Sequence, residues 1–387
     1  MAPKLRFKGY NDPWQSNKIG DVINNKSGKY NPEKDEKSYK CIELEHLSTN
    51  TGRLLGYIES IKSSSIKNKF QKGDVLFGKL RPYLRKHFHA SFEGVCSSEI
   101  WVLNGKNIVD SFLYMIIQRD YFIELANQST GSKMPRADWN VVSAGVINFP
   151  SFPEQKKIAS FLSVIDEKIQ MLRRKRELLE KYKKGVMQQL FTGKLRFKEE
   201  NGRSYTKGED ISIGEIFRFK QGVQAAIEEQ VFEPTNNFIR FIRIVDLTKI
   251  DEPIRYIKDP GKEHHLKEQD LFMVRYGNPG VVGFNYNGVI ANNLFRILPL
   301  DKRTNTNFFK YWFEYIKKDL DTLASSSTMP ALNFGSLNTL RVVLPTIKEQ
   351  NNISDYLNEI DKRISAVNKQ ITQTQTFKKC LLQQMFV

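Results

Sequence analysis

Apolar residues between positions 154 and 191 recur at alternating steps of four and three. The series consists of Ile158, Leu162, Ile165, Ile169, Leu172, Arg176, Leu179, Lys183, Val186 and Leu190, and eight of these ten positions are apolar. This spacing is the a/d pattern of a helix that packs lengthwise on another helix. A helix of this length would extend roughly 55 Å at about 1.5 Å per residue. The pattern therefore predicts a long spacer helix, interrupted along its seam by Arg176 and Lys183.

The same pattern occurs again 195 residues later. The second series consists of Ile353, Leu357, Ile360, Ile364, Val367, Ile371, Thr374, Lys378, Leu381 and Met385, again with eight apolar positions of ten. Short motifs repeat at the same offset: Glu154-Gln155 with Glu349-Gln350, and Ile165-Asp166 with Ile360-Asp361. A single offset over the whole stretch indicates a duplicated unit.

The segments between the two helical patterns read as mixed α/β domains. In the first, 74–80 and 95–103 are predicted strands and 111–127 a buried helix. The second has the same order, with a strand over 289–298 and a helix over 307–323, but little identity to the first. We predict an α+β fold with domains at 1–150 and 193–345 and spacer helices at 151–192 and 346–387. Equal scaffolds with different surfaces suggest two related tasks on two different targets.

Charge narrows the choice of partner. Sixty Lys and Arg residues against 43 Asp and Glu residues give a net charge of +17, and the isoelectric point is near 9.5. Such a balance favours a polyanionic partner, with nucleic acid first, although a generally Lys-rich composition is the alternative. Cys41, Cys96 and Cys380 share no close spacing, so neither a disulfide framework nor a thiolate metal site is indicated. No signal-peptide pattern or 18-residue apolar run occurs, so we expect a cytoplasmic protein without a membrane span.

Catalytic motifs are missing from the sequence. There is no phosphate-binding G-x-x-x-x-G-K-[ST] loop and no Pro-Pro pair of the kind that DNA amino-methyltransferases place beside an extruded base. The letters Glu-x-Lys of a metal-dependent nuclease occur at Glu154, but at a predicted helix start, and the duplicate ends in Asn351. His87 and His89 with Cys96 read as an unliganded strand pair, because no fourth ligand lies at a usual spacing. We predict a non-catalytic chain that binds no metal or cofactor.

Basic and aromatic residues gather in corresponding loops of both halves. Arg can bind guanine through two hydrogen bonds, Asn can read adenine, and Lys, Ser and Thr can hold phosphate. For any single residue a solvated loop is the better interpretation, but for the repeated set in a basic chain we favour DNA binding. The candidate DNA-binding residues are Lys79, Arg81, Tyr83, Arg85, Lys86, Lys133 and Arg136 in the first half, and Arg240, Arg243, Arg275, Tyr276, Asn278, Ser326 and Thr328 in the second.

The chain resembles the specificity subunit of type I restriction-modification systems over its whole length. The resemblance lies in the N-terminal PKLRFKGYNDPW, in FPSFPEQKKIASFLSVIDEKI and its counterpart LPTIKEQNNISDYLNEIDKRI, and in the junction KKGVMQQLFTGKLRFK with the repeated LLQQMF. The most specific part of the resemblance is a proline followed by Glu-Gln and a helix containing Ile-Asp. This motif is present twice at half-chain spacing.

The resemblance implies two target-recognition domains and two helices that pair antiparallel as a coiled coil, with pseudo-twofold symmetry. Each domain would read one half of a bipartite, asymmetric site in double-stranded DNA, and the helices would set the gap. They would also dock two methyltransferase subunits, with two motor-nuclease subunits joining the full complex. S-adenosylmethionine, Mg and ATP would be bound by those partners. Closure of the ring between the chain ends would come through the segment from Pro3 to Trp14.

Two other classes of function stay open at this point. A purely structural coiled-coil adaptor would use its charge for solubility and would not bind DNA in a salt-sensitive manner. A divergent methyltransferase would have to bind the methyl donor by itself, and the sequence offers no loop for it.

Overall fold

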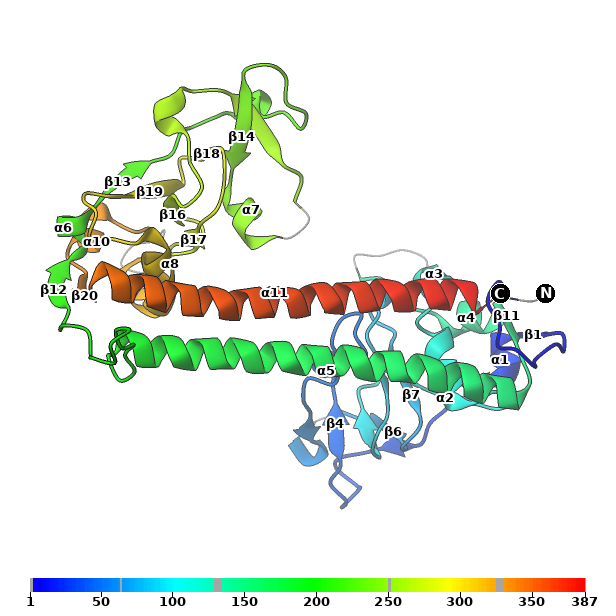
Figure 1. The fold of residues 1–387 in the computed structure, drawn as a ribbon. Coiled ribbons are helices and arrows are strands. Elements are labelled where there is room, and N and C mark those ends of the chain that lie inside the picture. Colours follow the sequence, from blue (N-terminus) through cyan, green and yellow to red (C-terminus); the bar gives the residue numbers. More distant parts are fainter. Residues whose placement is uncertain (1–2, 63–64, 129–133, 250–251, 325–329, 387) are drawn as a thin grey trace. The chain divides into compact units, whose positions relative to one another are not determined.

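The computed structural model describes residues 3–62, 65–128, 134–249, 252–324 and 330–386 (Figure 1). The chain forms two compact units. Unit 1 comprises Met1–Arg173 with Lys369–Val387, and unit 2 comprises Arg174–Asn368. Each unit thus contains one globular part, a segment of the first long helix and a segment of the second.

The two long helices are α5 (Phe152–Phe191, 40 residues) and α11 (Ile347–Gln384, 38 residues). In each unit the first part of one helix lies antiparallel beside the last part of the other (Figure 1). Ile158 and Leu162 share a core with Leu381 in unit 1, and Val186 shares one with Leu357 in unit 2. The prediction of two long, paired helices is confirmed. Among the described residues, none of the helices combines the length and the apolar character needed to cross a membrane.

The globular part of unit 1 contains a four-stranded sheet in the order β2-β10-β7-β8, a five-stranded sheet in the order β3-β6-β9-β4-β5, and the pair β1-β11. Its strands are β1 (Gln15–Lys18), β2 (Ile23–Asn24), β3 (Lys29–Tyr30), β4 (Lys40–Ile42), β5 (Ile58–Glu59), β6 (Lys67–Phe70), β7 (Val75–Gly78), β8 (His87–His89), β9 (Gly94–Cys96), β10 (Ile100–Gly105) and β11 (Val146–Phe149). Its short helices are α1 (Ile19–Val22), α2 (Asp110–Ile116), α3 (Asp120–Asn127) and α4 (Trp139–Ala144).

Unit 2 repeats the four-stranded sheet and, in β12-β20, the strand pair, but its second sheet has three strands, in the order β15-β14-β18, in place of five. Its four-stranded sheet has the order β13-β19-β16-β17, and β14 pairs in parallel with β18 as β4 does with β9. The strands are β12 (Glu209–Ser212), β13 (Phe217–Gln221), β14 (Phe238–Ile242), β15 (Arg255–Lys258), β16 (Leu271–Val274), β17 (Val282–Gly283), β18 (Val289–Ile290), β19 (Leu294–Pro299) and β20 (Arg341–Leu344). The short helices are α6 (Ile213–Ile216), α7 (Ile244–Thr248), α8 (Thr306–Tyr315), α9 (Lys317–Ala324) and α10 (Phe334–Asn338). The predicted internal repeat is therefore present at the level of strand order.

Four predicted elements are wrong in extent. The single strand expected over 95–103 is two strands, β9 and β10, because a turn closed by the Ile100 amide on the Ser97 carbonyl separates them. The strand expected over 289–298 breaks in the same way, where the Leu294 amide donates to the Ala291 carbonyl. The helices expected over 111–127 and 307–323 are each divided in two, α2 with α3 and α8 with α9. Polar residues lie at these breaks, such as Ser97-Ser98-Glu99 in the first, but the apolar residues on both sides make each segment resemble a single element.

The N-terminal segment is attached to the end of α11. The Leu5 amide donates to the Gln384 carbonyl at 2.9 Å, and the Trp14 ring lies 6.3 Å from that of Phe386. Within unit 2 the Leu195 amide makes the corresponding bond to the Gln189 carbonyl at 3.0 Å. A Leu-Arg-Phe-Lys segment thus contacts the end of each long helix in the same manner. At the end of α5 this segment comes next in the chain, whereas at the end of α11 it belongs to the N-terminal part of the chain.

Candidate nucleic-acid interface

The two candidate loops of unit 1 lie side by side. Leu80 forms an isolated bridge with Arg136, the Ala137 amide donates to the Lys79 carbonyl at 2.8 Å, and the Arg81 amide donates to the Pro135 carbonyl at 2.8 Å. Between them, Arg81 has a left-handed φ of 52°, a conformation that is unusual for a residue other than glycine. The backbone therefore fixes the place at which these basic side chains leave the domain.

Solvent-facing cations and one aromatic ring project from this pair of loops. Arg81 is exposed, and within the described part of the chain its guanidinium has no hydrogen bond or ion pair. Tyr83 is 53% exposed. Arg136 is exposed but lies 3.1 Å from the carboxylate of Glu99. Together they can bond phosphate oxygens or base edges, or stack on a base.

Two other candidates of the same loop are engaged inside the domain. The Arg85 guanidinium contacts Asp120 at 2.5 Å, and hydrogen bonding by this guanidinium holds the pKa of the Asp120 carboxyl below its usual range. The Lys86 ammonium donates to the Leu44 carbonyl at 2.7 Å. Both side chains attach the loop to its own domain. Lys133 lies outside the described residues.

Unit 2 brings together the corresponding loops. Tyr276 bridges to Ala331, and the Leu332 amide donates to the Arg275 carbonyl at 2.9 Å, as Ala137 does to Lys79. The Arg275 guanidinium donates to Gln221 and to the Leu332 carbonyl, and it lies 4.8 Å from the centre of the Phe334 ring. Asn278 is exposed. Ser326 and Thr328 lie outside the described residues.

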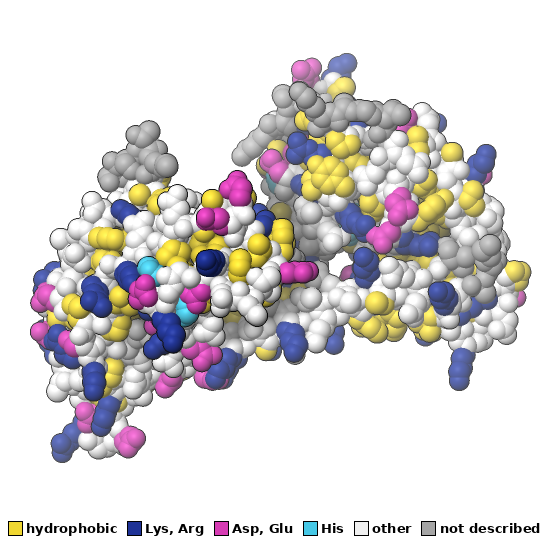
Figure 2. Space-filling view, turned by 90° about the horizontal axis from the view of Figure 1, so that it is seen from above, with side chains coloured by type: hydrophobic (Ala, Val, Ile, Leu, Met, Phe, Trp, Pro, Cys, Tyr) yellow, Lys and Arg dark blue, Asp and Glu magenta, His cyan; other side chains and the backbone are white. Residues whose placement is uncertain are grey.

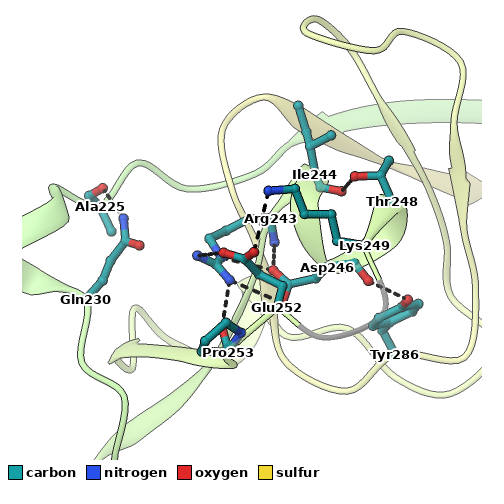
Figure 3. Close-up of polar contacts among 10 residues, drawn as sticks. All are labelled: Ala225, Gln230, Arg243, Ile244, Asp246, Thr248, Lys249, Glu252, Pro253 and Tyr286. Atoms are coloured by element: carbon teal, nitrogen blue, oxygen red, sulfur yellow. Dashed lines mark hydrogen bonds and ion pairs between the residues drawn. The ribbon is translucent and has the colours of Figure 1, made fainter. Parts of the chain in front are cut away.

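Arg243 is occupied by contacts within its own domain (Figure 3). It precedes α7, where its amide and its guanidinium both donate to Asp246, at 2.8 and 3.0 Å, while a terminal nitrogen donates to the Pro253 carbonyl at 2.9 Å. The guanidinium thus ties the start of α7 to the loop after it. Arg240, on β14, lies 5.3 Å from the centre of the Tyr286 ring. Its Nε is buried without a hydrogen-bond partner among the described residues.

The Lys and Arg side chains on the face drawn in Figure 2 are dispersed. On the face drawn in Figure 2, Lys and Arg side chains alternate with Asp and Glu over each unit instead of forming one continuous basic surface. The net charge alone therefore does not locate a candidate nucleic-acid-binding surface, and the position of the paired loops locates it better.

The repeated Glu-Gln motif attaches each helix to its domain. Glu154 is 1% exposed and accepts two hydrogen bonds from Arg6, both at 2.8 Å; Glu349 accepts two from Arg196. Gln155 accepts from the Val109 amide and donates to the Pro150 carbonyl. Gln350 makes the same two kinds of bond, with the Asn305 amide and the Pro345 carbonyl. Sequence reasoning noted this motif as a repeat but missed its role, although its identity at a fixed offset was a usable signal.

A partly buried acid–base pair joins the two helices in each unit. Lys378 contacts both carboxylate oxygens of Asp166 at 2.6 and 2.7 Å and donates to Gln118; burial lowers its pKa, an effect that Asp166 opposes. In unit 2, Lys183 contacts Asp361 at 2.7 Å and Glu314 at 3.0 Å. Burial lowers the pKa of Lys183, but the two carboxylates outweigh it and the pKa is raised. One of the two polar positions in each helical series, Lys183 or Lys378, thus forms an ion pair between the helices and also contacts the globular domain.

The other seam positions are mostly buried. Leu172, Leu179 and Ile364 are half-buried. The buried ones are Ile158, Leu162, Ile165, Ile169, Ile353, Leu357, Ile360, Val367 and Ile371.

No cluster of three or more His, Cys, Asp or Glu side chains suited to a metal ion occurs among the residues that the structure describes. His87 is fully buried against Tyr114, and burial lowers its pKa to about 3. Cys96 is also buried.

Comparison with known proteins gives the following findings. The family model for the type I restriction modification DNA specificity domain matches twice, at residues 11–181 and 206–374. The type I restriction enzyme MjaVIII specificity subunit of Methanocaldococcus jannaschii is 24% identical, with 75% of this chain and 73% of the relative covered. The crystal structure of a type I restriction-modification S subunit from M. genitalium matches with a TM-score of 0.62 at 18% identity, covering 100% and 99% of the two chains. A chain from a structure of a type I R-M system matches with a TM-score of 0.57 at 20% identity, covering 97% of each.

Proposed function

Because the chain belongs to the type I restriction modification DNA specificity family, we propose that it is the non-catalytic subunit that selects the DNA site of such a complex. Each unit reads one half of a bipartite, asymmetric site through its paired loops. The long helices dock two methyltransferase subunits, and two motor-nuclease subunits join the full complex. S-adenosylmethionine, Mg and ATP are bound by those partner subunits.

One observation carries this proposal. Both units hold the same two loops together by equivalent backbone bonds, through Leu80 with Arg136 and through Tyr276 with Ala331. The side chains that these loops present differ, with Arg81 and Tyr83 in unit 1 against Asn278 in unit 2. An equal frame with unequal side chains suits two recognition surfaces for two different base sequences.

The decisive experiment is base-modification sequencing of DNA from cells with and without the gene. We expect one motif, made of two specific blocks and a fixed gap, to lose adenine methylation when the gene is deleted. A methylome without any change, in cells whose partner methyltransferase copurifies with this chain, would refute the proposal.

Salt dependence separates DNA recognition from the role of a mere adaptor. A chain that contacts several phosphates loses affinity by orders of magnitude between about 50 and 200 mM salt, because bound counterions are released. We expect this steep dependence for the complex on its cognate duplex. A structural adaptor whose charge serves only solubility would instead show no salt-sensitive DNA binding.

A further inference from the structure

Unit 1 contains a cavity of about 770 Å³ where its globular part meets the two long helices. The wall of this unit 1 cavity is formed by the loop at 50–51, by residues 118–121 around the start of α3, and by side chains of α5 and α11. Every residue of the wall belongs to unit 1. The volume lies within the range of sites that hold a small molecule, about 300–1,000 Å³.

Cations outnumber carboxylates on this wall. In the part of the chain that the structure describes, five basic side chains line the cavity against two acidic ones, Asp120 and Asp166, which leaves a formal excess of three positive charges. The basic side chains are those of Arg85, Arg119, Arg173, Lys378 and Lys379. The cavity therefore has the sign of charge that attracts an anion.

Burial strengthens this preference. Burial lowers the pKa of Arg119, and it lowers the pKa of Lys378 although the carboxylate of Asp166 opposes the effect. The nearby charge of Arg173 lowers the pKa of Lys378 further. A cation that has lost water attracts an anion more strongly than a cation in bulk water does, because the local dielectric constant is lower.

The uncharged part of the wall is also polar. Asn50, Thr51, Thr372 and Gln375 contribute amide and hydroxyl groups, which can donate hydrogen bonds to oxygen atoms. His87 lines the cavity as well, and its Nδ1 is buried without a hydrogen-bond partner among the described residues. Buried polar atoms nearly always have a partner, so a partnerless one beside a cavity indicates a polar occupant.

The internal repeat shows that helix pairing does not require this excess of charge. Lys183 of unit 2 takes the place of Lys378. Lys183 contacts two carboxylates, those of Asp361 and Glu314, and they raise its pKa. Lys378 contacts one carboxylate together with the uncharged amide of Gln118. The same helix geometry is thus neutralised in unit 2 and left positive in unit 1.

Two helix positions on the wall differ in the same direction. Thr372 and Gln375 of α11 line the cavity in unit 1. The residues 195 positions earlier, in α5, are Glu177 and Glu180. Unit 1 therefore has uncharged side chains where unit 2 has carboxylates, which again favours an anion in unit 1 alone.

We propose that the unit 1 cavity binds a phosphate-bearing anion of small-molecule size. A phosphate group suits the wall because its charged oxygens accept hydrogen bonds from guanidinium, ammonium, hydroxyl and amide groups at once. Such an anion joins the loop at 50–51 to α11 and so stabilises unit 1. A DNA strand carries the same phosphate group, and the experiment therefore separates a free phosphate ester from a duplex. The inference is independent of the proposed function.

Calorimetric titration of the full chain with inorganic pyrophosphate or AMP, at fixed ionic strength and without DNA, tests the site. We expect saturable binding of one anion per chain and a higher melting temperature in its presence. Adenosine, which lacks the phosphate, should not bind. A short duplex replaces the small anion in a second titration. Binding of the duplex without binding of pyrophosphate or AMP, or no binding of any probe, would overturn the inference.

Charge-changing variants locate the site. Thr372→Glu with Gln375→Glu gives unit 1 the carboxylates of unit 2 and should weaken pyrophosphate binding at least about tenfold, because two negative charges then face the anion. Gln370→Glu with Gln373→Glu adds the same charge to exposed positions of the same helix outside the wall. This matched control should leave the dissociation constant within about twofold of the wild-type value.

A third variant keeps the test decisive if the first one unfolds. Lys379→Gln removes an exposed cation from the wall and should weaken pyrophosphate binding about threefold or more, with the melting temperature of the free protein unchanged. An equal loss of affinity in the matched control, or wild-type affinity in the folded wall variants, would show that the anion binds elsewhere.

Discussion

The basic residues of the unit 1 loop fall into two groups. Arg85 and Lys86 are bonded to Asp120 and to the Leu44 carbonyl, whereas Arg81 faces solvent. Surface charge is an ambiguous signal in a sequence, because an arginine that stabilises a domain and one that contacts DNA occupy the same kind of loop. Only the side chains free of internal partners are suited to give up water for a phosphate or a base.

Replacing Arg81 by alanine tests the loop as a DNA contact. We expect the affinity of the assembled complex for its cognate duplex to fall by about 1–3 kcal/mol, because a cation with no internal partner would lose its phosphate or base. Thermal stability should stay unchanged within about 0.5 kcal/mol, as for most surface substitutions. Unchanged affinity in a fluorescence-anisotropy titration would exclude this loop. Arg85→Ala is the contrasting variant, since it should lower thermal stability by breaking the bond to Asp120.

His87 makes the stability of unit 1 sensitive to acid. Burial lowers the pKa of His87 to about 3, so the native imidazole stays neutral while the unfolded one takes up a proton below about pH 6.5. The unfolded state then binds more protons, and stability falls as the pH drops. From this residue we expect a loss of about 2 kcal/mol between pH 7 and pH 5. Denaturant unfolding at both pH values measures the loss, and His87→Leu should reduce it; an unchanged pH dependence in that variant would contradict the assignment.

The long helices could be predicted almost to the residue, and the short elements could not. A period of 3.5 sustained over forty residues has no competing interpretation, and Phe152–Phe191 agrees closely with the expected 154–191. The segment 95–103 instead crosses two sheets, since β9 belongs to the five-stranded sheet and β10 to the four-stranded one, and the turn at Ser97 carries no proline or glycine. Pairing partners far apart in the chain decide such breaks, and a local pattern does not contain them.

Charge placed in the helix seam should separate the helices. Ile165 is 8% exposed within the core of unit 1, so Ile165→Asp buries a carboxylate without a counter-charge. We expect a loss of about 3–5 kcal/mol in the free energy of unfolding and loss of partner assembly. Val164→Asp, one residue earlier but 60% exposed, is the matched control and should unfold like the wild type. Equal stability of the two variants would refute the seam assignment.

At the scale of the whole chain, the internal repeat explains which features could be predicted from the sequence and which could not. The offset of 195 revealed two equivalent units, because helices that pack on each other tolerate little change. The base sequence that each unit would read under the proposed function stays unpredicted, since the side chains of the paired loops, such as Tyr83 and Asn278, differ between the two units. The role of Arg6 and Arg196 was missed, because an arginine 148 or 153 residues away from its glutamate leaves no local pattern.

Domain exchange tests the division of labour. Replacing residues 1–150 by the corresponding residues of another family member should change one block of the methylated motif and leave the other block and the gap unaltered. Base-modification sequencing reads the result directly. A change in both blocks, or in the gap alone, would contradict separate recognition by the two units.

The acid–base pairs between the helices make each half of the chain complementary to itself. Helix α5 supplies the acid Asp166 to one pair and the base Lys183 to the other, and α11 supplies Asp361 and Lys378 in the same roles. A single half of the chain therefore carries both the acid and the base of such an ion pair. Two identical halves could close on each other as an isologous dimer with both ion pairs intact. Such a dimer would present one recognition surface twice, and its DNA target would be a palindrome in place of an asymmetric site.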